Sequence, residues 1–421
     1  MIETTLLSPG VELRCFRDSR FKQGCLSLQL VRPMCQEEAA LNALLPSVLL
    51  RGTRRLPDLR SITHQLDDLY GAAISPLVRR VGDYQTTGFY CGFMDDRFAL
   101  PGDKVLEPTL KLMMELLLDS PLVDGGYLPE FVESEKKNLI STIESELNDK
   151  RAYAMNRLLK TMCRQDSYGI PRLGEKDQVA AITPQALKAH FDRILRESTI
   201  RLFYVGSAGA ETVAEVLRPL LASLPRDHKP LAPQTDFRDT QGSHETEIMD
   251  VAQGKLCMGF TTSITNRTQD FAAMQVLNVL YGGGMTSKLF QIIREKMSLC
   301  YHIGSGYYGA KGILTVSAGI DFDKEELTRQ EVLAQLEACC RGEITEAEVT
   351  AAREALLSSL RATHDAPGSI ESYYSTAALS GLGMTPAEYM AAVEGVTAEQ
   401  ASAAARTLRL HSTYFLKGES Q

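Results

Sequence analysis

The most informative part of this 421-residue sequence is LYGGGMTSKLFQIIREKMSLCYHIGSGYYGAKGILTVSAGI, residues 280–320. Three glycines open it, a segment with the apolar spacing of a helix follows at 288–296, and a strand pattern closes it at 312–320. Arg294 lies in the last turn of the predicted helix, and Tyr301 follows at the start of a strand. Two interpretations stay open. Either both side chains converge on one exposed edge, or Arg294 is a charge that suits a helix C-terminus and Tyr301 is a core residue.

The glycine run in this stretch invites a comparison with phosphate-binding loops, because glycines let backbone N–H groups approach an anion. The segment at 282–288, GGGMTSK, lacks the G-K-[ST] ending of a P-loop and the G-x-G-x-x-G spacing that follows a strand. A turn between two helices, in which glycines supply unusual dihedral angles, is the better interpretation.

The composition describes an ordinary globular protein. Hydrophobic residues make up 44% and charged residues 23%, and the length allows two to four domains. The net charge of −8 argues against a nucleic-acid-binding surface. No apolar run is long enough to span a membrane, and the N-terminus lacks the features of a signal peptide. The nine cysteines form no C-x-x-C pair, which argues against a disulfide framework and a cysteine-built zinc site. We therefore expect a cytoplasmic protein.

Short strand patterns alternate with longer helical ones on both sides of a linker. In the first half, strands are predicted at 11–16, 26–31, 85–93 and 200–205, and helices at 38–50, 58–70, 107–118, 128–160, 183–195 and 210–221. Three prolines and the loss of any apolar period mark a linker at 225–244. In the second half, strands are predicted near 247–262, 312–320 and 412–416, and helices at 268–281, 288–296, 324–340, 346–363, 369–380 and 398–408.

Matching segments on the two sides of the linker indicate an internal duplication. Val48 and Val279 are 231 residues apart, and so are Tyr70 and Tyr301, each in a similar local sequence. Together with the matching order of strands and helices, this spacing predicts an α+β protein made of two related halves. The predicted domains are residues 1–224 and 245–421, joined by the linker at 225–244.

His64, Asp67 and Asp68 lie in the predicted helix at 58–70, at spacings that place metal-binding side chains on neighbouring parts of its surface. A metal site is one interpretation. The other is an exposed helix surface, because the same helix carries a core-facing stripe of Ile62, Leu66 and Leu69. An autonomous metalloenzyme built on this trio therefore stays a third functional hypothesis, behind the two given below.

Residues 280–320, with their glycine turn, S-K-L-F, I-R-E-K and L-x-Y, resemble the C-terminal-domain signature of the pitrilysin/insulinase family of zinc metallopeptidases. The resemblance covers nearly the whole chain, including RGT at Arg51, LDDLYGA at Leu66 and DKRAYAMNRL at Asp149. It implies two homologous halves, each an antiparallel-rich sheet packed against helices, that form one half of a clamshell. It also implies that Arg294 and Tyr301 hold the substrate backbone near the scissile bond.

The departure from the family lies in the zinc motif. Active members carry H-x-x-E-H on a helix before the K/R-G-T, with two histidine ligands and a glutamate general base. Here the corresponding positions are Ala43, Pro46 and Ser47, and the position of the third ligand, a glutamate on a later helix, aligns with Thr142. The resemblance therefore implies that this chain holds no zinc and does not cleave peptides alone.

Loss of the metal site beside retention of Arg294 and Tyr301 is typical of a non-catalytic partner in the two-subunit branch of this family. Our leading hypothesis is a heterodimer with a zinc-bearing H-x-x-E-H paralogue that acts on a peptide substrate. This hypothesis includes neither a nucleic-acid partner nor a membrane-spanning segment. The alternative is a structural or assembly protein, or one associated with peptide-precursor processing or with elongation factor P modification, with no proteolytic role.

Overall fold

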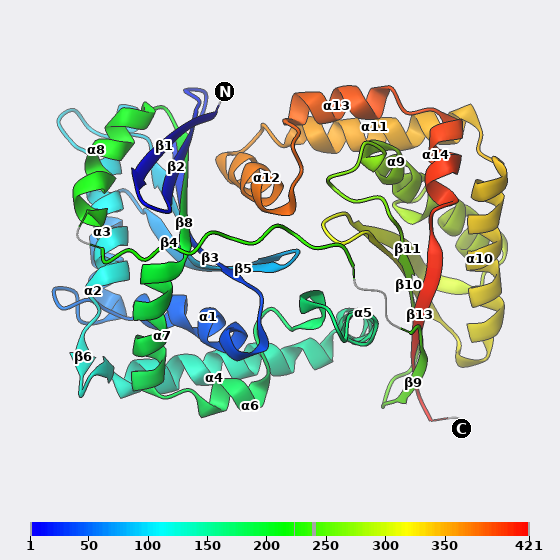
Figure 1. Ribbon diagram of the computed structural model, residues 1–421, viewed down its shortest axis with the longest axis horizontal. Coiled ribbons are helices and arrows are strands. Elements are labelled where there is room, and N and C mark those ends of the chain that lie inside the picture. Colours follow the sequence, from blue (N-terminus) through cyan, green and yellow to red (C-terminus); the bar gives the residue numbers. More distant parts are fainter. Residues whose placement is uncertain (1, 223, 238–240, 420–421) are drawn as a thin grey trace. The chain divides into compact units, whose positions relative to one another are not determined.

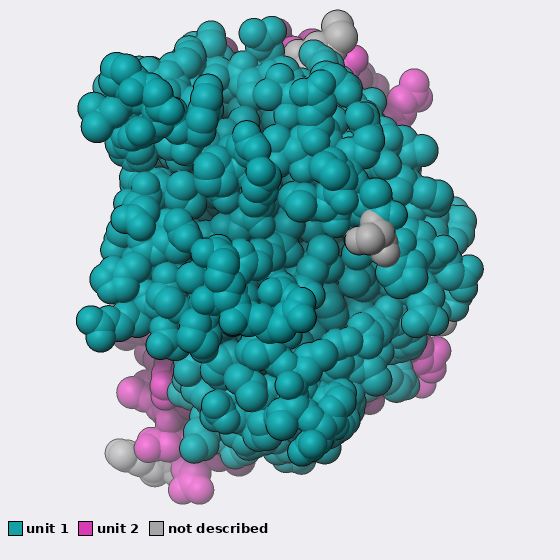
Figure 2. Space-filling model, turned by 90° about the vertical axis from the view of Figure 1, so that its left-hand side faces the viewer, with its two compact units in different colours: residues 1–144, 170–233, 364–376 teal, residues 145–169, 234–363, 377–421 magenta. Residues whose placement is uncertain are grey.

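The structure is a computed structural model that describes residues 2–222, 224–237 and 241–419. The chain divides into two compact units (Figure 2). Unit 1 comprises Met1–Glu144, Ile170–Pro233 and His364–Thr376, and unit 2 comprises Ser145–Gly169, Gln234–Thr363 and Ala377–Gln421. Each unit therefore contains a segment from the other side of the predicted linker. No helix among the described residues is both long enough and apolar enough to cross a membrane.

Unit 1 is built on a six-stranded sheet with the strand order β1-β2-β8-β3-β5-β4 (Figure 1). Its strands are β1 (Ile2–Ser8), β2 (Val11–Arg17), β3 (Gln23–Pro33), β4 (Ala73–Val81), β5 (Tyr84–Met94) and β8 (Thr199–Gly206). The β2–β8 pair is parallel, and the other neighbours are antiparallel. The prediction of an antiparallel-rich sheet is confirmed for this half.

Both faces of the unit 1 sheet are apolar where helices cover them. Alternate residues such as Leu13, Leu28 and Leu202 point into a core shared with one helical layer. This layer consists of α1 (Gln36–Leu49), α3 (Leu106–Leu118), α7 (Pro184–Glu197) and α8 (Ala210–Leu221). On the opposite face, Phe203 packs in a smaller cluster with Ile370. Ile370 belongs to α12 (Pro367–Ser380), whose residues up to Thr376 are part of unit 1.

The remaining elements of unit 1 are shorter or lie at its periphery. They are α2 (Leu59–Asp67), the 3-10 turn η1 (Asp96–Phe98), β6 (Leu122–Val123), β7 (Gly126–Tyr127), α4 (Pro129–Ser145) and α6 (Lys176–Ala181).

The single helix predicted at 128–160 is two helices in the structure. α4 ends at Ser145, a 3-10 turn η2 (Glu146–Asn148) follows, and α5 (Lys150–Met162) begins after Asp149. The Asp149 carboxylate accepts from the backbone N–H groups of Arg151 and Ala152, both at 3.0 Å, and so caps the new helix. The continuous prediction was wrong because a polar segment with an N-cap residue interrupts the apolar period.

Unit 2 repeats the topology of unit 1. Its sheet has the order β9-β13-β10-β12-β11, which corresponds strand for strand to β2-β8-β3-β5-β4. The strands are β9 (His244–Ile248), β10 (Gly254–Thr261), β11 (Cys300–Tyr308), β12 (Ile313–Ile320) and β13 (Arg409–Lys417). Its β13–β9 pair is parallel, as β2–β8 is in unit 1. The prediction of an α+β fold with two related halves is thus confirmed.

The helices of unit 2 are α5, α9 (Phe271–Gly282), the π-helix η4 (Leu289–Lys296), α10 (Glu325–Arg341), α11 (Glu346–Ala362), α13 (Pro386–Glu394) and α14 (Ala398–Ala405). Two short 3-10 turns are η3 (Ser167–Gly169) and η5 (Phe322–Lys324). A fully buried ion pair includes Asp166, the residue directly before η3. Lys311 Nζ and Asp166 Oδ2 are 3.0 Å apart, with 0% and 1% of the side chains exposed. Lys311 also donates to the Thr235 carbonyl at 3.1 Å, which fastens the linker to unit 2.

Candidate functional site

The structure brings Arg294 and Tyr301 together in unit 2. Arg294 lies near the end of the π-helix η4, and Tyr301 is the second residue of the edge strand β11. Ser298, in the turn between them, has a φ of 52°, which reverses the chain sharply. As a result, Arg294 Nε donates a hydrogen bond to the Tyr301 carbonyl at 3.0 Å. The interpretation in which Tyr301 is a core residue is wrong, because 65% of Tyr301 is exposed.

Neighbouring side chains fix the Arg294 guanidinium. Its carbon lies 4.6 Å from the centre of the Phe290 ring, one turn earlier on η4. Nη1 donates to Glu295 Oε1 at 2.7 Å. These contacts and the bond to the strand leave 38% of the side chain exposed, so the guanidinium is positioned before any ligand arrives.

The Tyr301 hydroxyl is part of a charged group beside the arginine. It donates to Asp321 Oδ1 at 3.3 Å, and Asp321 Oδ2 pairs with Lys324 Nζ at 2.7 Å. The hydrogen bond from Lys324 lowers the pKa of the Asp321 carboxyl, which is therefore ionised at neutral pH. A cavity of about 350 Å³ opens here, lined by Arg294, Glu295, Ser298, Leu299, Cys300, Tyr301, Asp321 and Lys324.

This arrangement suits binding rather than covalent chemistry. Guanidinium N–H groups and a phenol O–H are donors that a peptide carbonyl can accept. Cys300 is the thiol that lines the cavity, and burial raises its pKa to about 11, so it is protonated at neutral pH. A protonated thiol is a poor nucleophile.

The positions that the family resemblance aligns with the zinc motif lie on α1 in unit 1. Ala43 is buried, with 5% of it exposed, and Ser47 is partly buried. Pro46, at the position of the general base, lies inside the helix. A proline has no N–H to donate to the carbonyl four residues earlier, which belongs to Asn42. The Thr87 hydroxyl of β5 donates to this carbonyl instead, at 2.6 Å, so the helix continues through Pro46.

Thr142 lies exposed on α4, and its hydroxyl donates to the Asn138 carbonyl of the same helix at 2.9 Å. The chain just beyond the end of α1 meets α4 through a different contact. Arg51 Nη1 lies 3.2 Å from Glu135 Oε1, and the Arg51 guanidinium lies over the Phe131 ring. The R-G-T segment therefore keeps a structural role although the ligand positions before it have changed.

The residues at the positions that the family resemblance aligns with zinc ligands and base do not fit the metal. Zinc sites in proteins use thiolate, imidazole and carboxylate ligands, and the four positions here offer a methyl group, a proline ring and two hydroxyls. Within residues 2–222, 224–237 and 241–419, no three His, Cys, Asp or Glu side chains are arranged to hold a metal ion.

The three candidate metal ligands on α2 lie within the described residues, and they are not arranged to hold a metal ion either. His64, Asp67 and Asp68 are exposed, whereas Ile62 and Leu69 are buried beneath them. The metal-site interpretation of this trio has no support in the structure. The structure agrees with the other interpretation, a solvated helix surface above a core-facing stripe.

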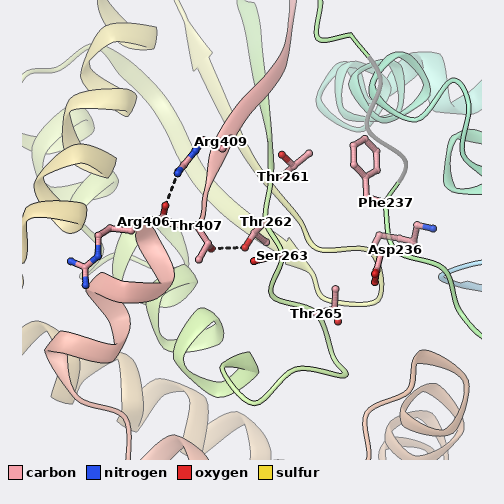
Figure 3. Close-up of a pocket in the computed structure, with 10 residues that line it drawn as sticks. Asp236, Phe237, Thr261, Thr262, Ser263, Thr265, Arg406, Thr407 and Arg409 are labelled. Carbon is pink, nitrogen blue, oxygen red and sulfur yellow. Dashed lines mark hydrogen bonds between the residues drawn. The ribbon is translucent and has the colours of Figure 1, made fainter.

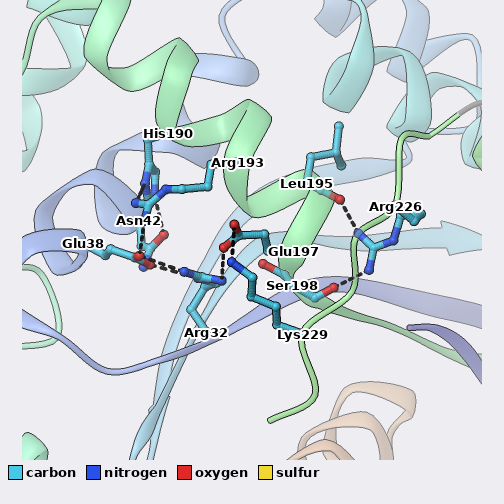
Figure 4. Close-up of polar contacts among 10 residues, drawn as sticks. All are labelled: Arg32, Glu38, Asn42, His190, Arg193, Leu195, Glu197, Ser198, Arg226 and Lys229. Carbon is cyan, nitrogen blue, oxygen red and sulfur yellow. Dashed lines mark hydrogen bonds and ion pairs between the residues drawn. The ribbon is translucent and has the colours of Figure 1, made fainter. Parts of the chain in front are cut away.

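A polar network that the sequence did not reveal holds α1 in place (Figure 4). Glu38 pairs with both Arg32, at 2.8 Å, and Arg193, at 3.0 Å. One turn further along α1, Asn42 Oδ1 lies 2.8 Å from His190 Nε2. Two polar residues four positions apart in the otherwise apolar segment 38–46 were the available signal, but their partners are distant in the sequence.

His190 is neutral in this network. Burial lowers its pKa to about 4. Its Nδ1 accepts from Arg193 Nη2 at 3.0 Å, so Nε2 carries the proton and donates to Asn42. Nearby, Arg226 donates to the carbonyls of Leu195 and Ser198, which ties residue 226 of the linker to the end of α7 (Figure 4).

A larger cavity in unit 2, of about 610 Å³, has no such convergent chemistry (Figure 3). Arg409 donates to the carbonyls of Arg406 and Leu408 at 2.6 and 2.8 Å, and Arg406 donates to the Cys340 carbonyl at 3.0 Å. Both guanidinium groups therefore satisfy backbone carbonyls at helix ends. Thr262 and Thr407 pair with each other at 2.6 Å.

The chain is similar to several known proteins. A family model described as Peptidase M16 inactive domain matches residues 181–356. "Probable inactive metalloprotease YmfF" of Bacillus subtilis (strain 168) is 28% identical over 409 residues, covering 97% of this chain and 96% of that protein. The crystal structure of a conserved protein from Enterococcus faecalis V583 has a TM-score of 0.91 and 25% identity, covering 100% of this chain and 99% of that one.

A second solved structure, a peptidase M16 inactive domain from Pseudomonas fluorescens, has a TM-score of 0.82 at 19% identity. It covers 100% of this chain and 98% of that one, and at this identity the likeness concerns the fold alone.

Proposed function

We propose that this chain, which is similar to inactive members of the pitrilysin/insulinase family of metallopeptidases, is the non-catalytic, substrate-binding subunit of a heterodimeric zinc peptidase. One observation carries the proposal. Arg294 and Tyr301 are assembled at the edge of the unit 2 sheet, while the α1 positions that correspond to the zinc ligands and general base of active members hold Ala43, Pro46 and Ser47. In this proposal the chain supplies donors for a bound peptide, and its partner supplies the groups that cleave it.

In this proposal, Arg294 and Tyr301 hold backbone carbonyls of an extended peptide beside β11. The Arg294 Nε is already bonded to the Tyr301 carbonyl and one N–H of Nη1 to Glu295, so Nη2 and the second N–H of Nη1 are the donors that a ligand can use. Because Phe290 and Glu295 fix the guanidinium beforehand, little side-chain entropy is lost on binding. The contribution to catalysis is orientation of the substrate.

Tyr301 can exchange its present partner for the substrate at low cost. Its bond to Asp321 is long, at 3.3 Å, and the Asp321 carboxylate keeps its pairing with Lys324 when the hydroxyl turns away. No buried charge is left unpaired by this exchange.

The partner in this proposal is a zinc-bearing paralogue with H-x-x-E-H, which contributes the metal and the general base. This chain contributes no metal ligand. We place the complex in the cytoplasm. In support, none of the nine cysteines, all of which lie in the described residues, is part of a disulfide, as is usual in a reducing compartment.

The test is co-expression with the zinc-bearing paralogue. We expect a stable complex with peptidase activity, and we expect R294A and Y301F each to lower kcat/KM about tenfold or more while the complex still forms. The matched control for the tyrosine is Y70F, because Tyr70 also donates from an exposed hydroxyl to a carboxylate, that of Asp103, but lies in unit 1. The matched control for the arginine is R329A, whose guanidinium pairs with Glu326 on α10.

Unchanged kcat/KM in both R294A and Y301F would show that the site has no role in substrate positioning. Stoichiometric zinc in the purified single chain would contradict the assignment of a non-catalytic subunit. Capture of a non-peptidase partner, with no zinc paralogue bound, would favour the alternative of a structural or assembly protein.

A further inference from the structure

The unit 1 sheet carries a charged cluster on the face that points away from α1, α3, α7 and α8. In the parallel β2–β8 pair, Glu12 lies opposite Arg201. Arg14 is two residues further along β2 and so points to the same face as Glu12. We call Glu12, Arg14 and Arg201 the Arg14–Arg201 cluster.

The charges of this cluster do not balance. Glu12 Oε2 lies 3.5 Å from Arg14 Nη2 and 3.7 Å from Arg201 Nε, so both contacts are too long to be good hydrogen bonds. Among the described residues, Glu12 is the carboxylate paired with either arginine. Two positive charges therefore share one negative charge.

The arginines are also incompletely hydrogen-bonded. Nε of both side chains and Nη1 of Arg201 are buried and have no hydrogen-bond partner in the part of the chain that the structure describes. Only 25% of the Arg14 side chain and 19% of the Arg201 side chain are exposed. Burial lowers the pKa of Arg201, and the neighbouring charge of Arg14 lowers it further. Unpaired donors in such a place are unfavourable until a partner is provided.

Another arginine on β4 shows what a complete pairing in unit 1 looks like. Arg79 donates to both oxygens of Glu371, at 3.0 and 2.8 Å, and Glu371 also accepts from the Ser27 hydroxyl at 2.7 Å. The Arg79 side chain is 27% exposed, close to the value for Arg14, so burial alone does not explain the difference.

We propose that the Arg14–Arg201 cluster binds a carboxylate of a peptide, either its C-terminal carboxylate or the side chain of an acidic residue. A carboxylate brings the charge of the cluster to zero, and its two oxygens match the planar fork of a guanidinium. Partial burial strengthens the attraction relative to that in bulk water. The inference deepens the proposed peptide-binding function and rests on it for the class of ligand.

The test measures direct binding to the purified full chain, without a zinc-bearing partner. The probes are fluorescein-labelled peptides of one otherwise neutral sequence. They end in either a free carboxylate or an amide, and they carry either Glu or Gln at one internal position. Fluorescence anisotropy should show about tenfold tighter binding for at least one carboxylate form than for the neutral peptide, and the pattern identifies which carboxylate is recognised.

Two substitutions should change the affinity in opposite directions. R201Q should reduce the affinity of the carboxylate peptide to that of the neutral one. E12Q should increase it, because it removes the carboxylate that competes for both guanidinium groups. The control is R60Q, which makes the same change in net charge at an exposed residue of α2. If R201Q unfolds the chain, the increase with E12Q still tests the proposal.

Equal affinity for the neutral and carboxylate peptides would overturn the proposal, and so would equal losses in R60Q and R201Q. The outcome is separate from that of the peptidase test. Carboxylate-dependent binding by a chain that forms no active complex would refute the proposed function and leave this site standing. An active complex whose chain shows no carboxylate preference would do the reverse.

Discussion

The hydrogen bond from Thr87 to Asn42 replaces one that Pro46 removed from α1, and its contribution to stability can be measured cleanly. The Thr87 side chain is 1% exposed, and its hydroxyl donates to the Asn42 carbonyl at 2.6 Å. Thr87→Val keeps the shape and leaves this buried carbonyl without its donor. We expect a loss of about 2 kcal/mol in the free energy of unfolding, the usual range for an unsatisfied buried group being about 1–3 kcal/mol.

The neighbouring Thr86 is a matched control. It is 0% exposed, and its hydroxyl has no hydrogen-bond partner among the described residues. Thr86→Val therefore removes no bond and should change stability by less than about 0.5 kcal/mol or increase it. The assay is urea unfolding at 25 °C, followed by circular dichroism, with all variants at one pH.

Pro46→Ala, combined with Thr87→Val, completes a double-mutant cycle. It restores a backbone N–H that can donate to the Asn42 carbonyl, so Thr87→Val should cost less in this background, with a coupling of about 1 kcal/mol. Equal losses in Thr86→Val and Thr87→Val would refute the reasoning, as would a Thr87→Val loss that is the same in both backgrounds.

Two further predictions concern buried charge. The folded pKa of His190, about 4, is below the unfolded value of about 6.5, so the unfolded state binds the extra proton and stability should fall by about 3 kcal/mol as the pH drops from 6.5 to 4. Urea unfolding between pH 5 and 7 measures this slope, and an identical slope in His190→Gln would exclude His190 as its source. Lys311→Met leaves Asp166 buried without its countercharge and should cost about 3–5 kcal/mol in the same assay at pH 7. Adding Asp166→Asn should recover part of this loss, and simple additivity of the two losses would contradict the pairing.

Much of the fold could be predicted because apolar periodicity is a local signal. Strands such as β3 and β5 are strongly apolar, and their alternation is visible without any partner. β4 was missed because Pro76 and two arginines disturb the pattern, which an edge strand tolerates. The 128–160 helix was predicted too long because both halves are good helix formers, and only the short turn η2 and the cap at Asp149 separate them.

The candidate site was predictable in part for the same reason. The family resemblance identified Ala43, Pro46 and Ser47 before Arg51 as the positions of H-x-x-E-H in active members, and it also identified Arg294 and Tyr301. The absence of zinc and the role in substrate binding both stay predictions. The pairing of His190 with Asn42 joins residues 148 positions apart, and no local pattern specifies such a partner. The imbalance at Arg14 and Arg201 likewise depends on the register of two strands that are distant in the sequence.

Each unit is built from segments on both sides of the linker, so cutting the gene at the linker does not separate the two units. A fragment ending at Pro233 would lack His364–Thr376, which includes Ile370 and Glu371, both 0% exposed in unit 1. A fragment beginning at Gln234 would lack Ser145–Gly169 and with it Asp166, the partner of Lys311. Neither fragment contains a complete unit. Experiments that need separate halves therefore call for co-expression of both pieces, with recovery of folding through fragment complementation as the readout.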